Sequence, residues 1–271
     1  MVQILDDIIL EDSTIGYIIG NNIKAIDFSK NEELDNFITN IKKLECKDIS
    51  KVYIEGCKEF DCDTIKKVEE KTDYSFAIGD KIRIHNIEIL LKKLPGLFNR
   101  ELDKNNLLIV SSSKERLIDI IKMLPTNLNC IASLGISEDN LYTDILKETG
   151  VSIYQPYKVD KAIKKFHIII NYGEEVYFDI NRIRNQCIIL DFSMNRSLSA
   201  VNGLNKNIIY IEDFNYPSKL NSNWIDDFID SRLYESIYKG KIERFSQVYV
   251  QGHYWYLNKY INGKIKKRGR L

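Results

Sequence analysis

Glycine and proline are scarce in this chain of 271 residues, which holds 13 glycines and 4 prolines. That scarcity excludes a collagen-like repeat, and 44% hydrophobic residues are enough to form a buried core. No apolar run reaches the roughly eighteen residues that a membrane span requires. The opening segment MVQILDDIILED is acidic and its apolar run is short, which argues against a signal peptide or a membrane anchor.

Cysteine is also infrequent, and its odd count of five does not indicate a disulfide framework. Without a secretory signal, free thiols in a reducing cytoplasm are the simplest interpretation. Cys57 and Cys62 are spaced C-x4-C, whereas structural zinc sites use two sets of short pairs, usually C-x2-C, and the sequence holds no second set. We therefore predict two ordinary thiols and no metal site.

Basic and acidic residues balance at 39 each, but residues 231–271 hold 10 basic and only 2 acidic side chains. Within residues 254–271 aromatic side chains alternate with basic ones, a composition that suits nucleic acid or an anionic membrane surface. The plainer alternative is a β-hairpin with a turn at Asn262-Gly263 and an exposed, solubilising basic end. The residues concerned are Tyr254, Trp255, Tyr256, Tyr260, Lys264, Lys266, Lys267, Arg268 and Arg270.

Residues 1–100 mix strand-like and helix-like patterns, and we expect a small N-terminal α/β domain there. The patterns predict a hairpin around Gly20-Asn21-Asn22, extended chain over residues 75–87, and a helix that stops at Pro95. The other expected elements are a helix that begins after an N-cap at Ser29, a strand at 51–56 and a helix at 63–73.

From residue 105 short apolar runs alternate regularly with amphipathic segments. Strands that are apolar on both faces and separated by helices indicate a parallel sheet covered on both sides, which is a doubly wound α/β fold. We expect this domain to span 105–215 and to be followed by a C-terminal helix and tail over 216–271. The expected strands are 107–112, 129–135, 151–156, 167–171, 186–193 and 206–214, and the expected helices are 114–124, 137–150 and 158–166.

The segment LLIVSSSKERLIDII, residues 107–121, has the form of a strand, a short loop and a helix. In nucleotide-binding units of this kind the loop is rich in glycine, and its backbone N–H groups hold a phosphate at the start of the helix. Here no glycine lies between Leu107 and Leu124. Ser111, Ser112, Ser113 and Lys114 are therefore the candidate phosphate contacts, with serine Cβ atoms where glycine is expected.

Ligands of doubly wound sheets bind beyond the carboxyl ends of the strands. Ser133 lies at the end of the second expected strand and Glu138 follows it, where a ribose would lie. Asn171, Gly173 and Asp191 end two later strands and are expected to line the same crevice. His167 begins a central strand, and we expect a satisfied, partly buried histidine there.

KVDKAIKKFHIIIN and QCIILDFSMN resemble two segments of the aminoacid-dehydrogenase-like families: shikimate dehydrogenase, glutamyl-tRNA reductase and methylenetetrahydrofolate dehydrogenase. The resemblance covers about a third of the chain. It implies a Rossmann-like domain that binds NAD(P), preceded by a substrate domain and followed by a returning helix. The catalytic Lys–Asp pair, cysteine nucleophile or Lys–Tyr pair of these families has no counterpart here that we can identify, so the catalytic residues are unknown.

Two main hypotheses follow. The chain is a non-catalytic descendant of such a dehydrogenase with a regulatory, scaffolding or binding role, or it is an NAD(P)-dependent oxidoreductase acting on a small metabolite. The missing glycines favour the first hypothesis, and the domain order favours the second. A small molecule at the carboxyl ends of the sheet, a protein partner and a second copy of the chain are the partners compatible with these hypotheses.

Overall fold

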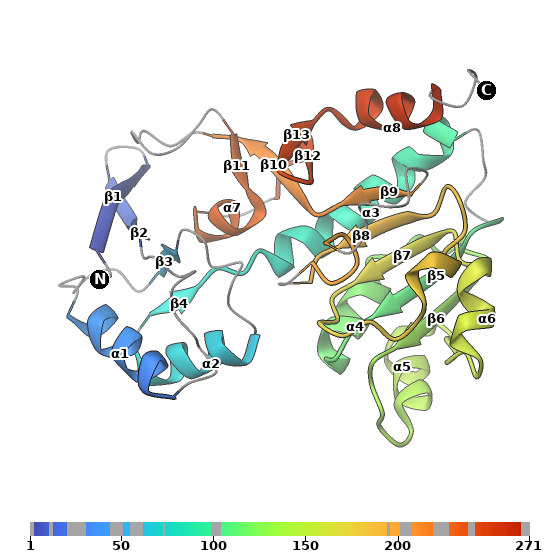
Figure 1. The fold of residues 1–271 in the computed structure, drawn as a ribbon, viewed down its shortest axis with the longest axis horizontal. Helices are drawn as coiled ribbons and strands as arrows, with labels where there is room; N and C mark the ends of the chain where they lie inside the picture. The colour runs from blue at the N-terminus through green and yellow to red at the C-terminus, as the bar shows by residue number, and fades with distance from the viewer. Residues whose placement is uncertain are drawn as a thin grey trace. The chain divides into compact units, whose positions relative to one another are not determined.

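The computed structural model describes residues 3–10, 13–20, 31–43, 51–54, 62–72, 74–98, 104–193, 196–200, 208–218, 228–237 and 242–266. The chain divides into two compact units (Figure 1). The first combines residues 1–82 with 216–243, and the second combines 83–215 with 244–271. We expected three successive parts of the chain, residues 1–100, 105–215 and 216–271. In the structure, residues 216–271 contribute to both units.

The first unit contains a four-stranded sheet in the order β1-β2-β3-β4. Its strands are β1 (Gln3–Leu10), β2 (Ser13–Gly20), β3 (Lys51–Ile54) and β4 (Ser75–Phe76). β2 pairs antiparallel with β1 and parallel with β3. β1 and β2 thus form a hairpin. The hairpin expected around Gly20-Asn21-Asn22 involves residues 21–30, which lie outside the described part of the chain.

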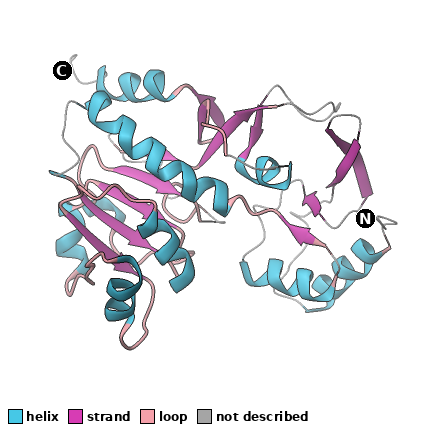
Figure 2. Ribbon diagram, turned by 180° about the vertical axis from the view of Figure 1, so that it is seen from behind, coloured by secondary structure: helices cyan, strands magenta, loops and turns pink. Residues whose placement is uncertain are grey.

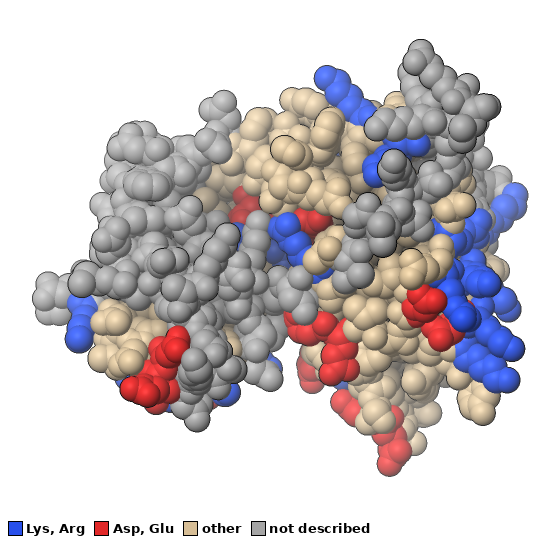
Figure 3. All heavy atoms as spheres, in the orientation of Figure 1, with Lys and Arg blue, Asp and Glu red and all other residues tan. Residues whose placement is uncertain are grey.

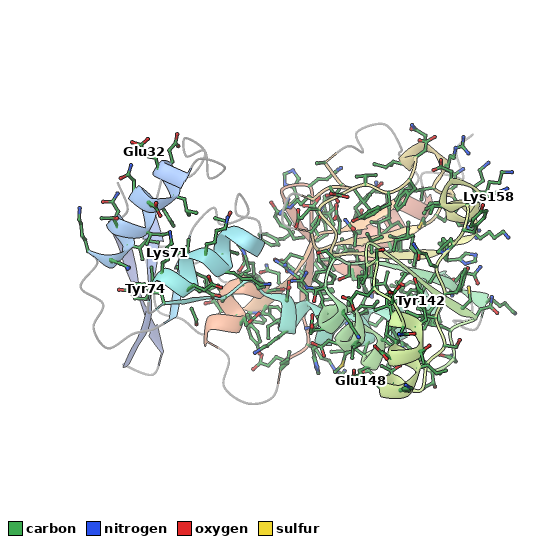
Figure 4. All side chains as sticks on the ribbon, turned by 90° about the horizontal axis from the view of Figure 1, so that it is seen from below. Glu32, Lys71, Tyr74, Tyr142, Glu148 and Lys158 are labelled. Atoms are coloured by element: carbon green, nitrogen blue, oxygen red, sulfur yellow. The ribbon has the colours of Figure 1, made fainter. Side chains whose placement is uncertain are left out.

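Two amphipathic helices, α1 (Asn31–Lys42) and α2 (Cys62–Lys71), belong to this unit. Their apolar side chains at helical spacing are buried, as Phe37, Ile41 and Val68 show. Lys71 Nζ on α2 lies 2.7 Å from Asp35 Oδ1 on α1, so the two helices are neighbours (Figure 4). The unit also contains β11 (Phe228–Asp230) and α7 (Ser231–Ile237). The helix that was expected to start within residues 224–228 begins at Ser231, and Phe228 is in β11; residues 224–227 lie outside the described part of the chain.

α3 (Asp80–Phe98) corrects the prediction of extended chain over 75–87. Only Ser75 and Phe76 are in a strand, and the chain turns at Gly79, which has φ +82°. Ile82, Ile87, Leu90, Leu91 and Leu94 are all buried at helical spacing. The helix also continues through Pro95 to Phe98, although the proline has no N–H to donate to the carbonyl four residues earlier.

The second unit contains a wholly parallel five-stranded sheet in the order β6-β5-β7-β8-β9. A sixth position is marked by a single parallel bridge between Tyr154 and Ala132, which places the expected third strand beside β6. Numbered along the chain, this is the order 3-2-1-4-5-6 of a Rossmann-like fold. The strands are β5 (Asn106–Val110), β6 (Cys130–Leu134), β7 (Ile168–Asn171), β8 (Ile188–Asp191) and β9 (Ile209–Ile211).

The side chains of β7 and β8 are buried on both faces, which explains their continuous apolar sequences. α4 (Lys114–Lys122) and α5 (Leu141–Thr149) follow β5 and β6, and α6 (Val159–Ala162) with η4 (Ile163–Lys165) leads into β7. α3 lies across the sheet when the molecule is seen from behind (Figure 2). The doubly wound α/β fold predicted from the sequence is confirmed. Among the described residues, no helix has both the length and the hydropathy of a membrane span.

The end of the chain corrects two predictions. The expected strand at 206–214 is divided into β9 and β10 (Asp213–Pro217), and β10 pairs antiparallel with β12 (Gln247–Val250). β12 and β13 (His253–Trp255) form a hairpin, but its turn lies at Gln251-Gly252 and not at the expected Asn262-Gly263. Residues 257–266, however, form α8, so Asn262-Gly263 is not a turn. Leu257, Tyr260 and Ile261 are buried at helical spacing, and this packing overrides the local preference of Asn-Gly.

Candidate functional site

The strand order reverses between β5 and β7, and in folds of this type the ligand binds at this switch point, beyond the carboxyl ends of the strands. The loops that follow β5, β6 and β7 begin at Ser111, Gly135 and Tyr172. The structure thus places the serine loop at the switch point, as the sequence predicted. The contacts of these loops determine whether a ligand can bind at the switch point.

The serine loop is closed by its own hydrogen bonds. Ser111 is fully buried, and its N–H donates to the Leu134 carbonyl at 3.0 Å. Its hydroxyl donates to the Ser113 carbonyl at 3.0 Å and accepts from the Ser113 N–H at 3.2 Å. One side chain therefore occupies both polar groups of the Ser113 backbone, including an N–H that a phosphate would use.

Ser113 is the N-cap of α4. Its hydroxyl oxygen accepts from the Arg116 N–H at 3.2 Å and donates to Glu115 Oε2 at 2.8 Å. Ser112 is exposed beside it. The run SSSK is explained by a serine cap at the start of a helix, which satisfies one of the free N–H groups of the first turn. The carboxylate of Glu115 stands at the same helix end, where an anion would otherwise be attracted.

Lys114 is paired with two carboxylates of the next strand–helix segment. Its Nζ lies 2.8 Å from Asp144 Oδ2 on α5 and 3.8 Å from Glu138 Oε2 in the preceding loop. The hydrogen bond with Asp144 raises the pKa of Lys114 and lowers that of Asp144. Glu138 lies before α5, which begins only at Leu141, so the expected early helical position of Glu138 was wrong.

Glycine at this site lies after β6 and β7 rather than after β5. Gly135 has φ +98°, and a Cβ on it would lie 2.5 Å from the Ser111 carbonyl oxygen. A Cβ on Gly173 would lie 2.8 Å from Val110 Cγ1. In dinucleotide folds a glycine permits the approach of the pyrophosphate. Here Gly135 permits the approach of the chain's own backbone at Ser111.

Tyr177, which the sequence did not single out, reaches both of these glycines. A Cβ on Gly135 would lie 3.4 Å from the Tyr177 hydroxyl oxygen, and one on Gly173 would lie 3.7 Å from Tyr177 Cε2. Burial raises the pKa of Tyr177, and the hydrogen-bonded carboxylate of Glu175 raises it further. The Tyr177 side chain is 37% exposed and lies beside both glycines, which follow the ends of β6 and β7.

The structure brings Asn171, Gly173 and Asp191 together, as expected for the ends of β7 and β8. Asp191 is fully buried and accepts four hydrogen bonds. One oxygen accepts from Asn171 Nδ2 at 2.8 Å and from the Ser193 hydroxyl at 2.7 Å. The other accepts from the N–H groups of Leu198 at 3.0 Å and Ser199 at 2.6 Å.

The same network fixes the backbone at Gly173. Asn171 Oδ1 accepts from the Gly173 N–H at 3.2 Å, and the Ser197 hydroxyl donates to the Gly173 carbonyl at 2.9 Å. Asn171 Nδ2 also donates to Ser197 Oγ at 2.9 Å. These polar groups hold the turn after β8 against the loop after β7, and their hydrogen bonds are directed at each other rather than outward.

Two other predicted residues lie elsewhere. Ser133 is buried within β6, and its N–H donates to the Tyr154 carbonyl at 3.0 Å, on the side away from β7. His167 Nδ1 accepts from the Asn106 N–H at 3.0 Å at the start of β7, the opposite edge of the sheet from the switch point. His167 is thus a satisfied histidine, as expected. Cys57 and residues 267–271 lie outside the described part of the chain.

The strand order and the switch point define a Rossmann-like α/β protein. No protein-family model matches the sequence, and no curated protein matches it either. Among the described residues, no group of three His, Cys, Asp or Glu side chains is placed to hold a metal ion.

Several solved structures are similar. A dipicolinate synthase chain from Bacillus halodurans has 11% identity and a TM-score of 0.36, over 55% of this chain and 56% of that one. L-tryptophan dehydrogenase from Nostoc punctiforme has 11% identity and a TM-score of 0.34, over 70% and 55%. D-mandelate dehydrogenase from Rhodotorula graminis has 11% identity and a TM-score of 0.33, over 54% and 51%. The matches thus span about half the length of these proteins, and no functional residue is carried over from them.

Proposed function

We propose that this chain is a non-catalytic Rossmann-like protein with a regulatory, scaffolding or binding role, working in the cytoplasm where its thiols stay reduced. The observation that carries the proposal is the arrangement at the switch point. The Tyr177 side chain lies beside Gly135 and Gly173, and the Ser111 side chain closes the loop in which a pyrophosphate would lie.

The site fits a dinucleotide poorly for reasons of space and charge. The loop has no glycine, so the Cβ atoms of its serines stand where backbone must approach the pyrophosphate. Lys114, the one cation of the loop, is directed at Asp144 and Glu138. A bound dinucleotide would have to displace the Tyr177 ring and compete with the Glu115 carboxylate at the start of α4.

The alternative is an NAD(P)-dependent oxidoreductase of the aminoacid-dehydrogenase-like type, acting on a small metabolite. The strand order 3-2-1-4-5-6 and the helix that starts directly after the serine loop favour it. This alternative requires Tyr177 to move and the Ser111–Ser113 hydrogen bonds to open when the cofactor binds.

Thermal unfolding in the presence of NAD⁺, NADH, NADP⁺ and NADPH separates the two. We expect the midpoint to change by less than about 1 °C with each dinucleotide at millimolar concentration. A ligand at a hundred times its dissociation constant would add about 2.7 kcal/mol, which corresponds to roughly 5–10 °C for a chain of this size. A saturable rise of that size with any one of the four would contradict the closed switch point that carries the proposal. A known NAD-dependent dehydrogenase in the same buffer is the positive control.

A further inference from the structure

The amino edge of the parallel sheet, opposite the switch point, is basic. Lys164 and Lys165 directly precede β7, and Arg182 and Arg184 precede β8. β7 and β8 are adjacent parallel strands, so the segments that enter them meet at one edge of the sheet. Arg184 belongs to the turn that closes on Cys187, whose N–H donates to the Arg184 carbonyl at 3.2 Å.

A direct contact joins the two segments. Asp160 Oδ1 on α6 accepts from the Asp179 N–H at 2.9 Å. Asp179 then accepts from the Asn181 N–H at 3.0 Å and from Arg182 Nε at 3.2 Å. The two acidic residues therefore hold the segments together. Residues 157–167 hold four lysines and one aspartate, and residues 179–186 hold two arginines and one aspartate, a combined formal charge of +4.

The cations face solvent. All four lysines and Arg182 are exposed, and Arg184 is half-buried. In the view of Figure 3, Lys and Arg side chains gather over α6, and Lys158 lies at the margin of the molecule in Figure 4. We name this surface the basic edge. It consists of Tyr157, Lys158, Lys161, Lys164, Lys165, Arg182 and Arg184.

Tyr157 adds an aromatic ring to the basic edge. It is 94% exposed, the most exposed of the large hydrophobic side chains described, and Lys158 Nζ lies 5.8 Å from its ring centre. A solvent-facing ring among cations offers a stacking surface for a base, and the cations around it offer partners for phosphates. The exposed amides of Asn181, Asn185 and Gln186 supply further hydrogen-bonding groups beside the arginines.

We propose that the basic edge binds single-stranded nucleic acid, with phosphates on its lysines and arginines and a base on Tyr157. The same charges would attract an anionic membrane, but surface helices that insert into lipid carry a broad apolar face. Residues 158–165 have four exposed lysines, and Ile163 is buried in the core. The basic edge includes no residue of the serine loop or of the hydrogen-bond network around Asp191, so the inference does not depend on the proposed function.

The test is fluorescence anisotropy of labelled twenty-nucleotide oligo-dT and oligo-U with the full-length protein at 50 and 200 mM salt. Contact with about four phosphates should weaken binding roughly 50-fold between the two salt concentrations. The triple variant Lys161→Glu/Lys164→Glu/Lys165→Glu should lose at least tenfold in affinity at 50 mM salt and show a smaller salt dependence. Tyr157→Ala should lose about tenfold with an unchanged salt dependence, because stacking does not release counterions.

Matched variants locate the site. Lys147→Glu changes one exposed lysine on α5, and Lys266→Glu/Lys267→Glu changes the basic C-terminal end; both should bind like the wild type. Far-ultraviolet circular dichroism of each variant checks that it is folded. The proposal is overturned if the wild type does not bind at 50 mM salt, or if the C-terminal variant and not the triple variant loses binding. It is equally overturned if the protein sediments with phosphatidylserine vesicles but ignores both oligonucleotides.

Discussion

Gly135→Ala is expected to lower the free energy of unfolding by about 3 kcal/mol, from left-handed strain together with a backbone clash. Gly135 has φ +98°, and its new Cβ would lie 2.5 Å from the Ser111 carbonyl oxygen. That oxygen belongs to the backbone of the loop after β5, so relief of the clash requires the loop to move. Equilibrium unfolding in urea, followed by circular dichroism, measures the change.

Gly150→Ala is the matched control. Gly150 also has a positive φ, +71°, at the end of α5, but a Cβ there would meet nothing within 4 Å. Only the conformational strain remains, and we expect a loss of about 1 kcal/mol. Equal losses in the two variants would show that the loop after β5 does not press on Gly135, which would contradict the closed switch point described above.

Asp191→Ala is expected to cost about 4 kcal/mol. The fully buried carboxylate accepts from Asn171, Ser193, Leu198 and Ser199, and its removal leaves four buried donors without their acceptor. Each such donor costs about 1–3 kcal/mol when it stands alone, and neighbouring losses are not additive. The two backbone N–H groups belong to the turn after β8, so we expect this turn to loosen first.

Asp179→Ala is the comparison for Asp191→Ala, because Asp179 is an exposed capping carboxylate at the start of η5. Its loss should cost about 1 kcal/mol. Both variants are measured by urea unfolding. If Asp191→Ala costs no more than Asp179→Ala, then the buried network around Asp191 does not hold the loops at the ends of β7 and β8.

The sequence predicted the structure best for strands that are buried on both faces of the sheet, because nearly every side chain of such a strand has to be apolar. The apolar runs before Ser111, Asn171 and Asp191 became the three central strands, because such runs suit only a covered parallel sheet. Their carboxyl ends could therefore be placed at one edge, and Asn171 was correctly placed beside Asp191.

Contacts between segments that are far apart in the sequence could not be predicted from apolar patterns. The alternating run IRIHNI is typical of a strand, yet Ile82, Ile84 and Ile87 are all buried within α3. The serine loop suggested a phosphate site, and nothing local indicated that the Ser111 hydroxyl binds the Ser113 backbone or that Tyr177 lies beside Gly135. Such contacts depend on how the loops after three strands meet, and the spacing of apolar residues along the sequence does not indicate this.

The most direct test of the closed switch point is the two-dimensional ¹⁵N–¹H NMR spectrum of the labelled protein, with the amide signals of Gly135 and Gly173 assigned by substitution. We expect both signals to stay in place when NADH or NADPH is added to several millimolar, because Tyr177 and the Ser111–Ser113 hydrogen bonds occupy the site. Saturable shifts of both glycine signals with either dinucleotide would show that the site opens to a cofactor and would contradict this account.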